Sequence, residues 1–126
     1  RQRPGKPLWF GTSRHGSIVF ALPGNPNSTL TCFYRYVASS IYILAGMGKM
    51  VPEQALLTSP YSFEPPLAQF LPVAASRTVS GTLEVEPLPT QKSGDLSHLA
   101  LSNGFIELPG EQNEFPVGYS APYYSW

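Results

Sequence analysis

The stretch Ser17-Ile-Val-Phe-Ala-Leu-Pro-Gly-Asn-Pro-Asn-Ser28 decides the fold of the first half of the chain. Its opening run, residues 17–22, is apolar and rich in β-branched and aromatic side chains, which predicts a strand buried on both faces of an α/β sheet. Asn25 is a good helix-capping residue, and Pro26 suits the first position of a helix. We therefore predict a strand that ends in a Pro-Gly-Asn-Pro turn and leads directly into a helix.

The helix is predicted over residues 26–46. Gly46 and Gly48 supply its stop signal. Apolar side chains recur at helical spacing and define one stripe, made of Leu30, Phe33, Tyr34, Val37, Ile41 and Leu44.

A second apolar run, residues 7–11, precedes this strand and is joined to it by a turn over residues 12–16. Two strands and one helix cannot bury a core alone, because the helix stripe needs more sheet than they provide. The chain also begins at Arg1 rather than at Met. We expect this half to be the end of a larger α/β domain.

From residue 51 onward the hydrophobic pattern changes to short runs separated by proline, glycine and serine. These features predict a small all-β barrel or sandwich. One short helix is predicted over residues 94–102. The expected domains are residues 1–50, an α/β fragment, and residues 51–126, the β-barrel. The candidate strands are 54–59, 68–75, 82–88, 104–108 and 117–124.

Composition excludes several classes of protein. The chain has 126 residues, of which 42% are apolar, and no window approaches the roughly 18 uninterrupted apolar residues of a membrane span. The single cysteine, Cys32, excludes an internal disulfide framework and makes the cytoplasm the expected compartment.

Charge is divided unevenly along the chain. Residues 1–50 carry six Lys and Arg and no acid, whereas residues 51–126 carry eight Asp and Glu and two cations. A basic half favours an anionic ligand such as phosphate, nucleic acid or an acidic surface. Chance is the alternative explanation of so short an acid-free stretch.

The predicted helix start is the best candidate for a site. A helix N-terminus presents unpaired backbone N–H groups and a positive dipole end, both of which attract phosphate. A well-capped turn with no ligand is the alternative. The candidate residues are Pro23, Gly24, Asn25, Pro26 and Ser28.

Other candidates are weaker on the residues alone. Arg3 and Lys6 lie on a proline-stiffened loop, where they would neutralise an oxyanion or simply be solvated. His15 and His98 lack acidic partners at metal-ligand spacing, so surface or core positions are expected for both. Cys32 is expected to be a buried, inert thiol.

Three motifs resemble the C-terminal third of the molybdopterin molybdenumtransferase family, the MoeA/gephyrin-E type. They occur in the family's order and cover nearly the whole chain. They are Arg-Pro-Gly-Lys-Pro-Leu-Trp-Phe-Gly (3–11), Phe-Ala-Leu-Pro-Gly-Asn-Pro-Asn-Ser (20–28), and Gln-Lys-Ser-Gly-Asp-Leu (91–96) followed by Leu-Ser-Asn-Gly-Phe-Ile-Glu-Leu-Pro (101–109).

The resemblance implies a fold and a reaction. Residues 1–50 would end a molybdopterin-binding α/β domain, and residues 51–126 would be the C-terminal β-barrel. The full-length enzyme would be a homodimer that, with Mg²⁺, inserts molybdenum from molybdate into molybdopterin-AMP and releases AMP. Its substrates are small molecules, so neither nucleic acid nor membrane is an expected partner.

The resemblance also assigns site residues. It matches Lys6 to the second basic residue of a Lys-Pro-Gly-Lys-Pro loop, and Ser93 to the serine of a Gln-Gly-Ser motif. The chain departs from the family at Arg3, Lys92 and Pro72, where Lys, Gly and Arg are usual. The Mg²⁺ ligands would lie upstream of Arg1, so the isolated chain is expected to be inactive.

Two alternatives remain at this point. A non-catalytic relative would use the same domains as a scaffold or partner-binding module. An unrelated anion- or nucleic-acid-binding module would instead depend on the basic first half, and its nucleic-acid affinity would fall steeply with salt.

Overall fold

The computed structural model describes residues 2–5, 7–64, 66–89 and 97–126. They form two compact units. The barrel unit contains Gln2, Arg3 and the residues from Val51 to Trp126, and the hairpin–helix unit runs from Pro4 to Met50. The prediction had placed residues 2–3 with the α/β half, but the structure pairs them with the barrel.

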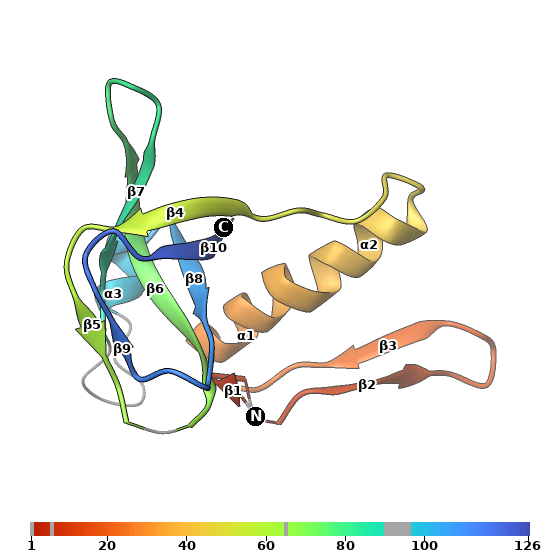
Figure 1. Ribbon diagram of the computed structural model, residues 1–126. Helices are drawn as coiled ribbons and strands as arrows, with labels where there is room; N and C mark the ends of the chain where they lie inside the picture. Colours follow the sequence, from red (N-terminus) through yellow and green to blue (C-terminus); the bar gives the residue numbers. More distant parts are fainter. Residues whose placement is uncertain (1, 6, 65, 90–96) are drawn as a thin grey trace. The chain divides into compact units, whose positions relative to one another are not determined.

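The barrel unit is a closed five-stranded barrel (Figure 1). It closes because β6 pairs with β7 and also with β8, in the cyclic order β6-β7-β4-β10-β8. All pairs in this ring are antiparallel except β4 with β7. The strands are β4 (Glu53–Leu57), β6 (Ala68–Arg77), β7 (Leu83–Pro87), β8 (Gly104–Leu108) and β10 (Ser120–Ser125).

Short elements complete the barrel unit. The strand β1 (Gln2–Arg3) adds in parallel to the start of β6. A two-stranded ribbon is formed by β5 (Tyr61–Ser62) and β9 (Glu114–Phe115), and α3 (Ser97–Leu101) is a single short helix. All five predicted strands are present within a few residues of their expected bounds, and the predicted barrel is confirmed.

Alternate residues of the strands form one hydrophobic core. Cross-strand pairs such as Leu71 opposite Ile106 belong to it, and both side chains are almost completely buried. Other members are Ala55, Leu57, Val73, Val85, Leu108, Phe115, Ala121 and Tyr123. A period of two in each strand places this set on one face of the sheet.

The intervening residues of β6, β8 and β10 form a second aromatic cluster. Phe105 stacks on Tyr124 with ring centroids 4.9 Å apart and meets Phe70 edge-on at 5.7 Å. Trp126 packs against Phe105 at 5.4 Å. Phe105 is 0% exposed, so both faces of these strands are buried.

The hairpin–helix unit opens with an antiparallel hairpin of β2 (Trp9–Thr12) and β3 (Ile18–Ala21). Phe10 and Phe20 face each other across it, with ring centroids 5.1 Å apart. The prediction that residues 17–22 are buried on both faces is wrong for this chain, since Ile18 and Val19 are about 40% exposed. Among the described residues β3 pairs with β2 alone, so its apolar side chains have too few neighbours to be enclosed.

The predicted helix is present but changes its winding. It begins as α1 (Pro26–Cys32), continues as a π-helical segment η1 (Phe33–Ala38), and ends as α2 (Ser39–Leu44). A π turn contains an extra residue, so the phase of the helix shifts at this segment. The predicted buried stripe is wrong in part.

Ile41 and Leu44, which belong to the predicted stripe, are 53% and 67% exposed. Tyr42 and Ile43 beside them are exposed as well, so this end of the helix has too few neighbours among the described residues to be covered on any side. Thr31 and Cys32, which come before the π-helical segment, are fully buried. In the described part of the chain, no helix is long and apolar enough to cross a membrane.

Candidate functional site

The helix start of the hairpin–helix unit has the capping geometry that the sequence predicts. Asn25 is the N-cap, with φ −72° and ψ 125°, and its Oδ1 accepts a hydrogen bond from the Ser28 N–H at 3.2 Å. Thr29 reinforces the turn through its hydroxyl, which donates to the carbonyl oxygens of Pro23 and Asn25. The turn is held in one conformation before any ligand arrives.

The surroundings of this turn favour an anion. The first turn of α1 contains no acidic residue, so nothing opposes the positive end of the helix dipole. A Cβ added at Gly24 would have no atom within 4 Å, so the space beside the backbone there is open. Pro23 and Ser28 are buried beneath the turn.

The structure places the remaining predicted residues as follows. Arg3 lies on β1 of the barrel unit, is exposed, and is opposite Gln69 of β6. Lys6 and Ser93 lie outside the described residues, as does the rest of Gln91–Gly94. The helix start therefore brings together five of the eight predicted site residues.

The histidines are placed as a surface and a core residue. His15 is exposed in the β2–β3 turn. His98 of α3 is 7% exposed, and neither of its ring nitrogens has a hydrogen-bond partner among the described residues.

A magnesium ion does not fit the described residues of this chain. Among them, no group of three or more His, Cys, Asp or Glu side chains is arranged to hold a metal ion.

Cys32 is expected to be unreactive in the folded protein. It is completely buried, and burial raises the pKa of its thiol, so the nucleophilic thiolate is scarce at pH 8. A disulfide reagent should label it slowly at pH 8 in buffer and at least about tenfold faster when denaturant opens the helix. Equal labelling rates in the two conditions would show that the thiol is accessible.

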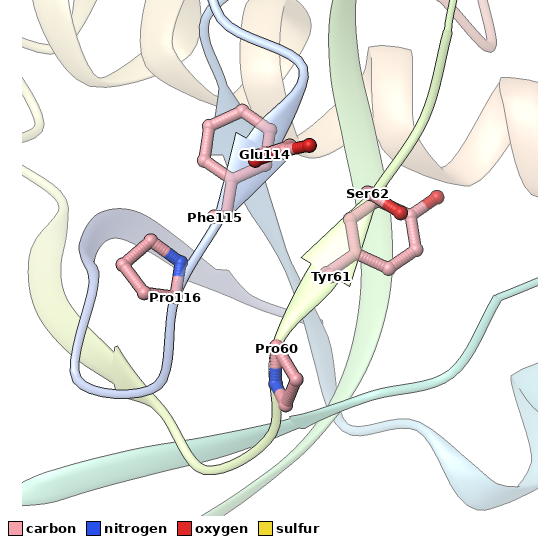
Figure 2. A pocket seen from close by; sticks show the side chains of 6 residues that line it. All are labelled: Pro60, Tyr61, Ser62, Glu114, Phe115 and Pro116. Carbon is pink, nitrogen blue, oxygen red and sulfur yellow. The ribbon is translucent and has the colours of Figure 1, made fainter.

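The barrel unit has a concave surface that was not predicted from the sequence. It lies in the barrel unit beside the β5–β9 ribbon and has a volume of about 500 Å³ (Figure 2). We call it the ribbon hollow. Its lining residues are Pro60, Tyr61, Ser62, Glu114, Phe115 and Pro116.

Comparison with known families identifies the barrel. Residues 54–126 match the family model of the MoeA C-terminal region (domain IV). The chain belongs to the MoeA family. The match covers all five barrel strands except the first residue of β4.

Curated MoeA relatives extend the similarity to the hairpin–helix unit. A molybdopterin molybdenumtransferase of Synechocystis is 40% identical over 126 residues, which is 99% of this chain and 30% of that protein. A molybdopterin molybdenumtransferase of Staphylococcus epidermidis is 30% identical over 119 residues, or 93% of this chain and 28% of that protein. The chain thus spans less than a third of the curated MoeA relatives it matches.

Solved MoeA structures share the fold. One molybdopterin biosynthesis MoeA protein of Pyrococcus horikoshii matches 98% of this chain and 30% of that chain, with a TM-score of 0.72 and 28% identity. Another structure of MoeA from Pyrococcus horikoshii covers 99% of this chain and 30% of that chain, with a TM-score of 0.71 and 23% identity.

Proposed function

We propose that this chain is the C-terminal part of an enzyme that inserts molybdenum from molybdate into molybdopterin-AMP and releases AMP. The proposal is supported by relatives named molybdopterin molybdenumtransferase, to which the chain is similar over 99% of its length. In this proposal the hairpin–helix unit ends a molybdopterin-binding α/β domain. The complete enzyme is a cytoplasmic homodimer that takes its Mg²⁺ ligands from the residues of the longer protein.

The main structural support for a role of this chain in binding the anionic reactants is the preformed helix start. Its open, acid-free N-terminal turn suits the phosphate of the pterin substrate or the incoming molybdate oxyanion. Because Asn25 and Thr29 already fix the turn, little conformational entropy is lost when an anion is held there. Holding two anionic reactants in one geometry is the contribution that we assign to this turn.

Gly24 tests this role with little effect on folding. Gly24→Ala should leave the thermal midpoint nearly unchanged, since the new methyl group meets no atom within 4 Å. In the full-length enzyme it should lower AMP release about tenfold or more, because the methyl group occupies space that the anion needs. Wild-type turnover of a folded Gly24→Ala enzyme would remove the helix start from the site.

Lys6 tests the contribution of the loop before β2. Lys6→Ala in the full-length enzyme should weaken anion capture, and so raise the molybdate concentration needed for turnover, more than it lowers stability, because a cation that holds an oxyanion is lost. Arg14→Ala is the matched control, since Arg14 is an exposed cation at the far turn of the β2–β3 hairpin. An unchanged molybdate dependence, with wild-type turnover, would contradict the role of Lys6.

The chain alone is expected to show no molybdenum insertion. The measurement is AMP release from molybdopterin-AMP by the 126-residue chain, compared with the full-length enzyme under the same conditions. Turnover by the isolated chain would overturn the assignment of the Mg²⁺ ligands to the rest of the protein.

A further inference from the structure

The ribbon hollow is formed by two short segments that lie far apart in the sequence. Tyr61 pairs with Phe115, and Ser62 pairs with Glu114, across the antiparallel β5–β9 ribbon. Figure 2 shows the rings of Pro60 and Pro116 along one side of the hollow, with Ser62 and Glu114 toward the other. The hollow therefore combines proline and aromatic rings with the oxygen atoms of Ser62 and Glu114.

The aromatic floor of the hollow is rigid. Phe115 is 1% exposed and is held between Phe63, which stacks on it at 6.3 Å, and Tyr119, which meets it edge-on at 5.0 Å. Tyr61 is fixed by a 2.7 Å hydrogen bond that its hydroxyl oxygen accepts from Gln69 Nε2. These contacts set the shape of the hollow before a ligand binds.

The charge within the hollow is negative. Of its six lining residues Glu114 is charged, and none is Lys or Arg. Glu114 is exposed, and its carboxylate forms no ion pair or hydrogen bond with a described residue. Arg3, which acts electrostatically on Tyr61, comes from β1 rather than from either segment.

Tyr61 presents a neutral ring to the hollow. Burial raises the pKa of its phenol, although the hydrogen bond from Gln69 and the charge of Arg3 act in the opposite direction. A neutral phenol keeps the negative face of its ring available to a cation at physiological pH.

We propose that the ribbon hollow binds the arginine side chain of a partner protein segment, with the guanidinium at Glu114 and its flat face against Tyr61 and the proline rings. Arginine fits better than lysine because its planar group stacks on rings and presents paired N–H donors to a carboxylate. The Glu114 carboxylate favours a cationic occupant over an anionic one. The proposal goes beyond molybdenum insertion and stands without it.

The test is a nuclear magnetic resonance titration of the 126-residue chain with N-acetyl-arginine amide. The neutral citrulline analogue, which has nearly the same shape, is the matched ligand control. We expect the arginine probe to shift the amide signals of Ser62, Glu114 and Phe115, and the citrulline probe to leave them in place. Raising the salt concentration should weaken the arginine shifts, since the pair at Glu114 is exposed.

Two protein variants distinguish arginine binding at the ribbon hollow from a nonspecific effect of negative charge on the protein surface. Glu114→Gln should weaken arginine binding about fivefold, the effect of losing one exposed charge pair. Glu84→Gln makes the same charge change on β7, outside the hollow lining, and should bind like the wild type. The proposal fails if citrulline binds equally, if the two variants behave alike, or if the arginine probe causes no shift at its solubility limit.

Discussion

Gly104→Ala should destabilise the barrel by about 3 kcal/mol or more, which corresponds to a fall in the thermal midpoint of about 12 °C for a unit of this size. Gly104 lies where β8 meets β10. A Cβ at this position would collide with the carbonyl oxygen of Tyr124 and would lie 2.5 Å from Cε2 of Tyr123 and 2.6 Å from its hydroxyl. One of these obstacles is backbone, so the strands must separate to admit a methyl group.

Calorimetry of the wild type and two variants measures this effect. Gly24→Ala is the matched control, because the same substitution meets no atom within 4 Å and no positive φ is involved. We expect the control to change stability by less than about 0.5 kcal/mol. If both variants lose the same small amount of stability, the β8 and β10 strands can move apart at Gly104 at little energetic cost, which would contradict the prediction.

Phe105→Ala should lower the free energy of unfolding by about 3–5 kcal/mol, although Phe105 does not belong to the main core. Its ring is fully buried and contacts Phe70, Tyr124 and Trp126, so truncation leaves a cavity within the second aromatic cluster. Urea unfolding followed by far-ultraviolet circular dichroism measures the loss of stability. Phe105→Leu should cost less, since it keeps most of the apolar volume.

Phe33→Ala is the control for Phe105→Ala. Phe33 is 38% exposed on the helix, so its truncation should cost less than about 1 kcal/mol. If Phe105→Ala costs no more than Phe33→Ala, the aromatic cluster contributes no more to stability than a half-exposed ring, and only the inner face of the barrel acts as a core.

The barrel could be predicted because its strands are regular and well separated. β8 has Phe105 and Ile106, and β10 has Tyr123 and Tyr124, near proline or glycine turns, so the pattern locates these strands. β4 has no β-branched or aromatic residue and is located by its short apolar run between turns. The helix cap could be predicted for a similar reason, since Asn25 and Pro26 act through local geometry.

Other features depend on contacts that sequence patterns do not contain. The strands β1, β5 and β9 have two residues each, too few for a periodic signal, and they exist only because a distant segment pairs with them. The π-helical segment likewise has no residue signature in Phe33–Ala38 that distinguishes it from an α-helix. The exposure of Ile41 and Leu44 likewise depends on which neighbours cover the end of the helix, not on the pattern of the helix itself.

The two candidate sites also differ in how far they could be predicted from the sequence. The helix start is contiguous in sequence, so the residues of its turn could be named in advance. The ribbon hollow joins Tyr61 to Glu114, and nothing in either segment indicates the other. Ser62 and Pro116 have no chemistry of their own that would single them out.

The parallel pairing of β1 with β6 has a consequence for the order of folding. Gln2 pairs with Ala68, so the whole hairpin–helix unit is a loop between the two strands. Closing so long a loop costs more conformational entropy than forming the neighbouring β6–β7 hairpin, and contacts distant in sequence form slowly. The β6–β7 hairpin should therefore form before β1 pairs with β6, which makes β1 a late-forming strap on a strand that already has a partner.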